Sequence, residues 1–501
     1  MSAPLRLGRR VGVIDIGSNS VRFVLFHVFG ASFSPTYNEK ILAGLGRDLR
    51  DTGRLSESGK ADTLAALRRF RHLADARGLS PVLIGATAAL RDATDAPDFL
   101  AEVAAETGFH IQPISGESEA RLAAAGVLAG DKRSEGIACD LGGASLELVE
   151  VRDGKAGRGV SLNLGPFQVV GDDLLGDFDP DVQTPLIDAA LADAEVELSG
   201  ERTLHLVGGA WRNLMTLHQK RVGYPLRVLQ SYTLDADMAG AFCRWAFGEG
   251  REEVLSAPGV SARRRETLAY GALVLDRLIH RFRPLRVRVS ASGLREGLVV
   301  EHLRTLRESR SPLHDACRDL ARGNLQADGF ARPLMDFLEP VSMNFPRAFD
   351  PDSESRLRVA ACHMAGMGKG FHPDYRARLV FEQVLYAPLP GLLHAERAYL
   401  ANIMHATYTW SHITPDEATL DLLLTPEQRR CARIFGSAVR LAVAACGRAV
   451  ELLPQLSLHM ESGTIALRAR PGFGDLVTPR VGKRLRILNG RLQVTDQEEG
   501  V

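Results

Sequence analysis

Two stretches of the chain repeat the same order of apolar and polar positions. In residues 13–24 an apolar run ends at Asp15, small polar residues follow, and a second apolar run begins. Residues 138–149 repeat this order around Asp140. Short apolar runs separated by Gly, Ser and Asn predict two strands joined by a tight turn. We therefore predict one β-hairpin at each place.

The two aspartates lie 125 positions apart, which is about one domain length and predicts a duplicated α/β fold. Apolar positions at helical spacing in residues 61–73 predict a helix, and residues 81–85 predict a buried strand. Ser115 is a candidate N-cap for a helix over residues 117–128. In the second half, residues 205–209 and 287–293 again predict strands followed by glycine turns. Strand and helix alternate, as a layered α/β architecture requires.

This pattern changes near residue 309. We predict two α/β domains over residues 1–128 and 129–308, because strand signals thin out after them and helical spacing dominates. An α-helical domain is predicted over residues 309–458. A small β element is predicted over 459–501, because Asn-Gly within the alternating residues 485–494 is a strong hairpin signal.

Composition narrows the class of protein. The chain has 501 residues, 45% of them hydrophobic and 24% charged, which is typical of globular domains and excludes a disordered or membrane-embedded chain. Lys+Arg and Asp+Glu both number 61, so no net charge favours non-specific binding to nucleic acid. The six cysteines are scattered without a CxxC pair, which predicts a reducing cytoplasm. The longest uncharged run, residues 398–415, is too short and too polar to span a membrane.

Each predicted hairpin turn has the chemistry of an anion site. Backbone N–H groups and small hydroxyls of such a turn can surround phosphate oxygens, and the aspartate before it can hold a hydrated divalent ion. The same residue types are also ordinary turn formers, so one copy alone indicates little. Two copies at domain spacing favour a site in which facing turns clamp a phosphate chain, with Asp15 and Asp140 sharing a metal.

Four motifs in register resemble the exopolyphosphatase and guanosine pentaphosphate phosphohydrolase family, called Ppx/GppA. They are residues 15–20, 85–91, 114–121 and 140–145. The resemblance extends over residues 11–300 and implies two actin-like, ribonuclease H-like domains of the superfamily that includes Hsp70 and sugar kinases. The helical remainder resembles the HD-like domain of long family members.

The resemblance also implies roles for single residues. Glu119 matches the catalytic carboxylate that activates water, and Arg91 matches a cation that faces the phosphates. From the residues alone, Glu119 could equally serve only to favour a helix N-terminus. Metal-side carboxylates implied by the family, for Mg²⁺ or another divalent cation, are Asp15, Asp140 and Glu147. The implied phosphate-binding turn residues are Gly17, Ser18, Asn19, Ser20, Gly142, Gly143, Ala144 and Ser145.

The chain departs from the family pattern at several positions. Ala144 replaces a third glycine, and Leu146 replaces a residue that usually carries a hydroxyl. Residues 208–212 occupy the place of the superfamily's nucleotide-side glycine loop, where Trp211 would crowd the loop, and residues 293–297 resemble the closing motif of the family. In the helical domain the usual His-Asp doublet is His363-Met364, which lacks a carboxylate for metal.

Polar side chains of the helical domain are open to two interpretations. A channel for a long polyanion or a solvated helix face would both explain Arg356, Arg358, Lys369, Arg376, Arg378 and Arg397. The remaining histidines, His372, His394 and His405, lack acidic partners in the sequence and are predicted to be structural. The pair His314-Asp315 is predicted to lie at an exposed helix end.

The sequence therefore predicts a metal-dependent exopolyphosphatase that removes terminal phosphate from inorganic polyphosphate, with guanosine pentaphosphate as a further candidate substrate. One alternative is a catalytically weak sensor of guanosine tetraphosphate or polyphosphate, and another is an actin-like kinase or ATPase. The resemblance implies a homodimer. Neither nucleic acid nor membrane is an expected partner.

Overall fold

The computed structural model describes residues 9–171, 178–198, 200–258, 262–303, 311–322 and 330–493. The chain divides into two compact units, Met1–Glu308 and Ser309–Val501, which are called the first and second unit below. Within the described residues no helix is both long and apolar enough to cross a membrane. All six cysteines are buried free thiols.

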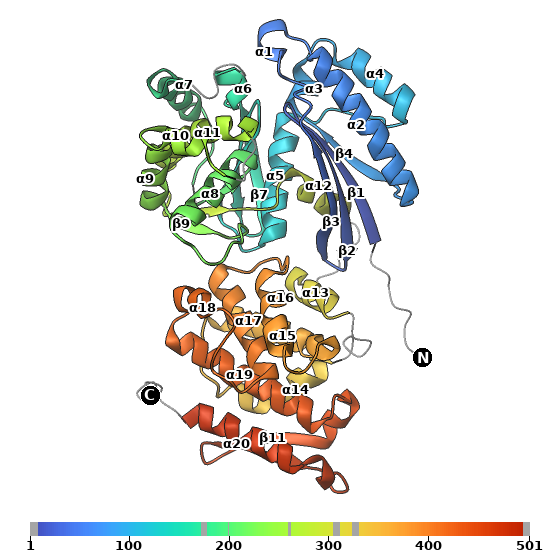
Figure 1. The fold of residues 1–501 in the computed structure, drawn as a ribbon, viewed down its shortest axis with the longest axis vertical. Coiled ribbons are helices and arrows are strands. Elements are labelled where there is room, and N and C mark those ends of the chain that lie inside the picture. The colour runs from blue at the N-terminus through green and yellow to red at the C-terminus, as the bar shows by residue number, and fades with distance from the viewer. Residues whose placement is uncertain are drawn as a thin grey trace. The chain divides into compact units, whose positions relative to one another are not determined.

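The first unit contains two sheets with the same strand order (Figure 1). One sheet has the order β3-β2-β1-β4, and the other begins β7-β6-β5-β8 and continues with β10 and β9. In both, a hairpin of antiparallel strands lies beside a parallel fourth strand. The strands are β1 (Arg9–Ile16), β2 (Val21–Phe29), β3 (Ser32–Ile41), β4 (Val82–Ala86), β5 (Gly136–Leu141), β6 (Leu146–Arg152), β7 (Lys155–Leu162), β8 (Thr203–Val207), β9 (Thr233–Asp235) and β10 (Arg286–Val289). The predicted duplication is thereby confirmed.

Helices cover these sheets because each has one apolar face to bury. On the first sheet, Phe70 of α2 stacks on Phe23 of β2 with ring centroids 5.3 Å apart, in a core shared with α4. The second sheet is covered by α7, α8, α9 and α11, whose core includes the fully buried Trp211. These helices are α2 (Glu57–Ala76), α4 (Ala96–Thr107), α7 (Pro180–Ala192), α8 (Gly209–Arg221), α9 (Ala236–Phe247) and α11 (Ala262–Phe282). Short helices are α1 (Leu49–Thr52), α3 (Ala88–Asp92), α6 (Pro166–Val169) and α10 (Arg251–Leu255).

Two helices pack between the sheets of the first unit and tie them together (Figure 1). α5 (Gly116–Gly130) lies against β5, β6 and β7, although the predicted boundary after residue 128 groups it with the first sheet. Conversely, α12 (Leu294–Leu303) packs on β1 and β4 through Val299 and Leu303. Each sheet therefore receives a helix from the other half of the sequence.

The two helices touch through glycines. A Cβ at Gly297 would overlap the carbonyl oxygen of Leu122, and one at Gly126 would overlap that of Gly293. Helix α5 begins after Ser115, whose hydroxyl accepts a hydrogen bond from the Ser118 N–H, as an N-cap should. This cap confirms the predicted helix start.

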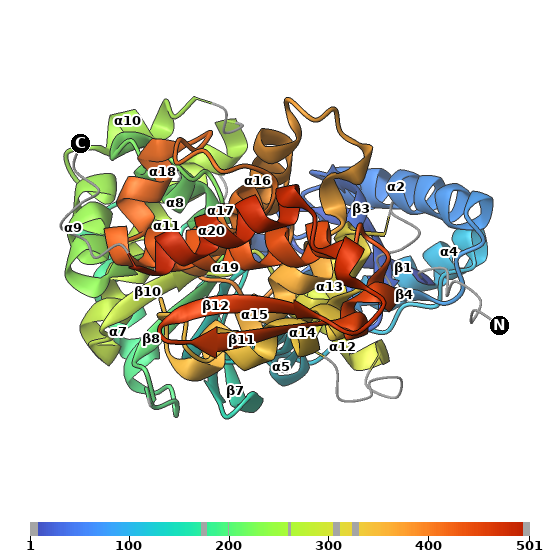
Figure 2. The same cartoon turned by 90° about the horizontal axis from the view of Figure 1, so that it is seen from below.

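The second unit is mostly α-helical and ends with a hairpin and a helix. Its helices are α13 (Pro312–Leu320), α14 (Ala331–Ser342), α15 (Pro351–Met364), α16 (Arg376–Tyr386), α17 (His394–Tyr408), α18 (Glu417–Leu423), α19 (Pro426–Ala445) and α20 (Pro479–Gln493). Nearly every residue of α17 is buried, so it forms the centre of this unit. The hairpin of β11 (Leu456–Glu461) and β12 (Thr464–Ala469) lies beside α14 and α20 (Figure 2).

The predicted hairpin over residues 485–494 is wrong, because residues 485–493 belong to α20 and residue 494 lies outside the described residues. Leucines at positions 485, 488 and 492 have helical spacing. Because a helix buries Leu488, this segment favours a helix over a hairpin. The observed hairpin turn lies earlier, at Ser462 and Gly463, which both have positive φ as a two-residue turn requires. Asn489 instead bonds both backbone groups of Ile465 from the side of the helix.

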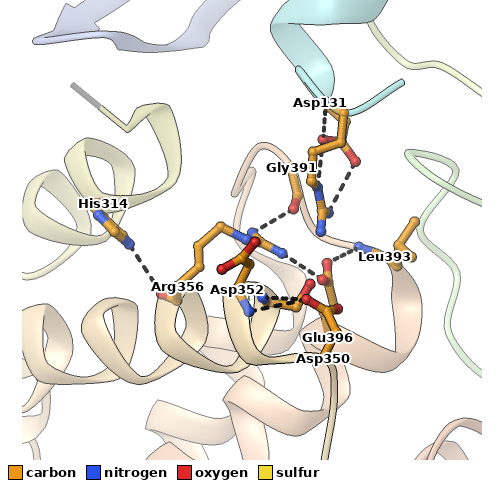
Figure 3. A network of polar contacts seen from close by, with 10 residues as sticks. Asp131, His314, Asp350, Asp352, Arg356, Gly391, Leu393 and Glu396 are labelled. Carbon is orange, nitrogen blue, oxygen red and sulfur yellow. Dashed lines mark hydrogen bonds and ion pairs between the residues drawn. The ribbon is translucent and has the colours of Figure 1, made fainter. Parts of the chain in front are cut away.

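Three arginines that could have lined a channel bind groups of their own unit, and Figure 3 shows the contacts of Arg356. Arg356 donates to the Gly391 carbonyl at 2.8 Å and to the Glu396 carboxylate at 2.5 Å. Arg358 binds Glu354, and the fully buried Arg397 donates to the carbonyls of residues 385, 387 and 389. These side chains hold the helices together, and Arg358 also lines a cavity of about 480 Å³ beside α14.

Two further predictions concern this unit: the one for Arg378 is correct, and the one for His314-Asp315 is wrong. Arg378 pairs with Glu382 on an exposed helix face, as the solvated-face interpretation requires. His314-Asp315 is not an exposed helix end, because Asp315 is buried and the His314 ring contacts the Arg356 carbonyl at 3.1 Å. Burial of α13 against α15 accounts for this difference.

The glycine contact between α5 and α12 yields a first prediction. Gly297→Ala should lower the melting temperature of the first unit by about 4 °C or more, because a backbone carbonyl cannot move aside for the new methyl group. Differential scanning calorimetry measures the change. Gly490→Ala is the control, since Gly490 lies in α20 with open space around it and should stabilise its helix slightly. Equal stability of Gly297→Ala and the wild type would contradict the close packing.

Candidate active site

The two hairpin turns that follow Asp15 and Asp140 are closed in the same way. The Gly17 N–H donates to the Ser20 carbonyl at 3.0 Å, and the Gly142 N–H donates to the Ser145 carbonyl at 2.9 Å. In both cases the aspartate is the next-to-last residue of the first strand and lies two positions before the turn glycine. The repeated sequence pattern therefore produces two copies of one local structure.

The turns approach each other closely. A Cβ placed on Gly143 would lie 3.6 Å from the Ser18 Cβ of the other turn, and 2.9 Å from the Phe167 ring. A cavity of about 230 Å³ lies between them in the first unit. Its lining includes these predicted residues: Asp15, Gly17, Ser18, Asn19, Ser20, Glu119, Asp140, Gly142, Gly143, Ala144, Ser145 and Glu147. The structure thus brings together all predicted site residues except Arg91.

Arg91 does not line the cavity, and its guanidinium group contacts the Glu119 carboxylate. Its Nη1 atom is 3.3 Å from a Glu119 carboxylate oxygen and also donates to the Ile114 carbonyl. Its Nε donates to Asp92, so the guanidinium is fixed on two sides. In this structure Arg91 orients the carboxylate and does not line the cavity.

Three further carboxylates line the cavity, two of them buried and one half-buried. Glu119 comes from the first turn of α5, and Asp140 and Glu147 face each other across the strands β5 and β6. Glu147 is almost completely buried and accepts a hydrogen bond of 2.8 Å from the Ser161 hydroxyl. Asp140 has no hydrogen bond or ion pair with any side chain among the described residues.

Burial disfavours the charged forms of these groups. It raises the pKa of Glu119 to about 7, with Asp140 adding to the rise and Arg91 opposing it. Burial likewise raises the pKa of Asp140 to about 6, although Arg212 opposes this rise. The pKa of Glu147 lies well above its ordinary value because of burial and the charges of Glu119 and Asp140. A base with a pKa near 7 is suited to taking a proton at neutral pH.

Four cations line the same cavity. Arg295 is 3.9 Å from the Asp15 carboxylate, and Arg212 donates to the Gly208 carbonyl at 3.0 Å. Arg22 and Lys40 also line the cavity. Sequence reasoning missed Arg212 and Arg295 as site residues. The signal was present, since each follows a glycine motif that the sequence shares with the superfamily.

The glycines of those motifs leave room for Asp140. A Cβ at Gly208, whose φ is +107°, would lie 3.3 Å from one Asp140 oxygen and closer still to the Leu141 carbonyl. Trp211 does not crowd this loop, contrary to the sequence-based expectation, because its indole is buried in the core and donates to the Gly271 carbonyl. Leu146 is also buried in the core and does not line the cavity, so only Ala144 alters the turn there.

The carboxylates fit a divalent cation such as Mg²⁺. The described residues contain no cluster of three or more metal-ligating side chains. Mg²⁺ does not require one, because it is commonly held by one or two carboxylates together with water and substrate oxygens. Asp140 is a half-buried carboxylate without a hydrogen-bonding or ion-pair partner in the described part of the chain, and Asp15 lines the cavity from the other turn.

Comparison with known proteins agrees with this geometry. The fold is that of the actin-like phosphatases: a solved structure of an Aquifex aeolicus member of the Ppx/GppA family matches 60% of this chain and 99% of that one, with a TM-score of 0.52 and 26% identity. The model of the Ppx/GppA phosphatase family matches residues 25–306, and that of the exopolyphosphatase C-terminal region matches residues 324–494. The chain therefore belongs to the Ppx/GppA phosphatase family.

Curated relatives carry a more specific name. Exopolyphosphatase 1 of Mycobacterium tuberculosis is 27% identical over 306 residues, which cover 59% of this chain and 88% of that protein. Exopolyphosphatase 1 of Mycobacterium leprae is 25% identical over 322 residues, which cover 62% and 94%. A solved exopolyphosphatase from Cytophaga hutchinsonii, with 21% identity and a TM-score of 0.50, shares the fold.

The raised pKa of Asp140 predicts that the metal-free protein loses folding stability as the pH rises. The folded state keeps a proton on Asp140 up to about pH 6, whereas the unfolded chain releases it near 3.8. The resulting loss of stability therefore grows between these values and is complete above them. Asp140→Asn should raise the melting temperature of the metal-free protein at pH 8 by several degrees, reflecting about 2 kcal/mol, and change it little at pH 4.

The Asp140→Asn variant also tests whether Asp140 binds Mg²⁺. Mg²⁺ should raise the melting temperature of the wild type more at pH 8 than at pH 4, because a protonated carboxylate binds it poorly. Asp140→Asn should lose most of this gain. A gain from Mg²⁺ that is the same in both proteins would exclude Asp140 as a ligand.

Proposed function

We propose that this protein is a metal-dependent exopolyphosphatase that removes terminal phosphate from inorganic polyphosphate. One observation carries the proposal: the buried Glu119 carboxylate, held by Arg91, opens into a cavity lined by two facing turns of the kind that bind phosphate. The names of the relatives support the same substrate.

In the proposed reaction the terminal phosphoryl group lies between the turns. N–H groups and hydroxyls of residues 17–20 and 142–145 would contact its oxygens, as in other backbone anion sites. A water molecule beside Glu119 gives its proton to the carboxylate and attacks phosphorus. The bond from phosphorus to the bridging oxygen breaks, and the shortened chain leaves with that oxygen. Little else is required, because phosphoryl transfer depends mainly on positioning and charge neutralisation.

Charge neutralisation is divided between the two sides of the cavity. Arg212 and Arg295 would contact phosphate oxygens from the side of the glycine motifs. Asp140 and Asp15 would hold the divalent cation, with Glu147 behind Asp140. When bound, the cation would neutralise negative charge on the phosphate oxygens.

The lining of the cavity favours a linear phosphate chain over guanosine pentaphosphate. Phe167 is the one aromatic residue among the described lining residues, and its ring packs against Gly143. With Trp211 turned into the core, no broad aromatic surface is left in this lining for a purine to stack on. Guanosine pentaphosphate is therefore the secondary substrate in this proposal.

We include a homodimer and a reducing compartment in the proposal. The homodimer rests on the resemblance to long family members, and light scattering coupled to gel filtration tests it. The six buried free thiols support the compartment, because cysteines in oxidising compartments are usually paired.

Glu119→Gln tests the role of the general base. Phosphate release from long-chain polyphosphate should fall by about two orders of magnitude or more at saturating substrate and Mg²⁺, because the amide cannot accept the proton from water. Glu117→Gln is the matched control, since Glu117 is exposed two residues earlier on the same helix and should leave the rate within about twofold. Guanosine pentaphosphate serves as the second substrate.

Three results would contradict the proposal. Full activity of Glu119→Gln would show that Glu119 is not the general base. Binding of polyphosphate by the wild type without phosphate release would identify a sensor instead. Transfer of the phosphoryl group to an added hydroxyl acceptor would identify a kinase.

A further inference from the structure

One short loop of the first unit supports two of the four cations that line its cavity. This β10–α12 loop comprises residues 290–293. Arg295 is the second residue of α12, directly after the loop. Arg212 comes from α8, and its Nη1 atom donates to the Ala291 carbonyl of the loop at 3.4 Å. The place of this loop therefore affects both guanidinium groups.

Arg212 depends on backbone carbonyls for its orientation. Within the described residues it has no ion pair with a carboxylate. Its guanidinium group donates to the carbonyls of Gly208 at 3.0 Å and Ala291 at 3.4 Å. Gly208 directly precedes the same helix, so Ala291 is the contact from a distant part of the chain. A hydrogen bond of 3.4 Å is already long, and a small shift of the loop would break it.

The loop is connected to its surroundings at both sides of Ala291. The Ser290 N–H donates to the Leu206 carbonyl of β8 at 2.8 Å, and the Gly293 N–H donates to the Glu296 carboxylate at 2.8 Å. Ala291 itself is held by a side chain, because its N–H donates to Oε1 of Gln230 at 2.8 Å. Gln230 thus fixes the residue whose carbonyl accepts from Arg212.

The local structure brings the Gln230 amide to this place. Ser231, the next residue, is buried and has a φ of +65°, in the left-handed region that few residues other than glycine adopt. The Ser231 N–H donates to the Val289 carbonyl at 3.0 Å, which fixes this segment beside the end of β10. Gly130, the last residue of α5, leaves space for the amide, because a Cβ there would lie 2.9 Å from Gln230 Nε2.

We propose that Gln230 is a positioning residue of the active site, whose side-chain oxygen holds Ala291 so that Arg212 can contact a phosphate group. Gln230 does not line the cavity and would act through Arg212. The inference rests on the proposed function, which assigns Arg212 to phosphate oxygens. A planar guanidinium group binds phosphate oxygens in a fixed geometry, so a change in its orientation weakens the contact.

Two substitutions separate the oxygen of Gln230 from its size. Gln230→Met keeps the length of the side chain but removes the acceptor. It should lower kcat/KM for long-chain polyphosphate by about fivefold, mainly through a higher KM, as expected for the loss of one hydrogen bond. Gln230→Glu keeps an oxygen acceptor and should stay within about twofold of the wild type. Steady-state phosphate release at varied polyphosphate and saturating Mg²⁺ gives both parameters.

Gln219→Met is the matched control. The Gln219 amide donates to the Val228 carbonyl at 3.0 Å and so holds the same segment without a hydrogen bond to the β10–α12 loop among the described residues. Its substitution should lower the melting temperature at least as much as Gln230→Met does, but leave kcat/KM within about twofold. A purely structural role for Gln230 predicts that both variants lose activity together with stability.

A double-mutant cycle with Arg212→Gln tests the route of the effect. If Gln230 acts through Arg212, Gln230→Met should change kcat/KM by less than about twofold once Arg212 is replaced. A second loss of about fivefold in this background would overturn the proposal. Equal losses for Gln230→Met and Gln230→Glu, or for Gln230→Met and Gln219→Met, would also overturn it.

Failure of the proposed function has a separate signature. If the wild type binds tripolyphosphate but releases no phosphate, the proposed activity is wrong, and the same cycle is measured as tripolyphosphate affinity by calorimetric titration. Non-additive losses of affinity would then support the role of Gln230, and additive losses would overturn it. A wild type that neither binds nor hydrolyses phosphate chains would overturn both proposals.

Discussion

The structure of the first unit depends on keeping the Glu119 carboxylate buried between two turns that face each other. Burial of Glu119 close to Asp140 and Glu147 is unfavourable, and Arg91 is the one cation in direct contact with Glu119 among the described residues. The position is maintained because α5, which carries Glu119, packs against α12 with glycine at each close approach. Sheet order, helix packing and the Ser115 cap all converge on this one carboxylate.

The two duplicated turns have the same hydrogen-bonding pattern, but the charged groups around their aspartates differ. Asp15 has a cation, Arg295, within 3.9 Å, whereas Asp140 has no hydrogen-bonding or ion-pair partner within the described residues. The second aspartate is therefore the better candidate for a metal ligand.

The second unit shows how context decides the role of arginine. Arg356 donates hydrogen bonds to a carboxylate and Arg397 to backbone carbonyls, and these bonds hold helices together. Arg480 and Arg484 line a cavity between α19 and α20 together with like charges. The sequence contains no signal that separates these two groups, because both lie on helices with similar neighbours. Partners that are distant in sequence make the difference.

The sequence alone determined the two hairpins, the α/β duplication and the start of α5, because turns, caps and alternating strands depend on neighbouring residues. The same motifs placed all but one of the predicted site residues in the lining of one cavity. Only the tertiary structure decided that Arg91 lies behind Glu119, that Arg212 and Arg295 join the site, and that residues 485–493 form a helix. These outcomes depend on burial and on charges that approach from distant parts of the chain, which local patterns do not record.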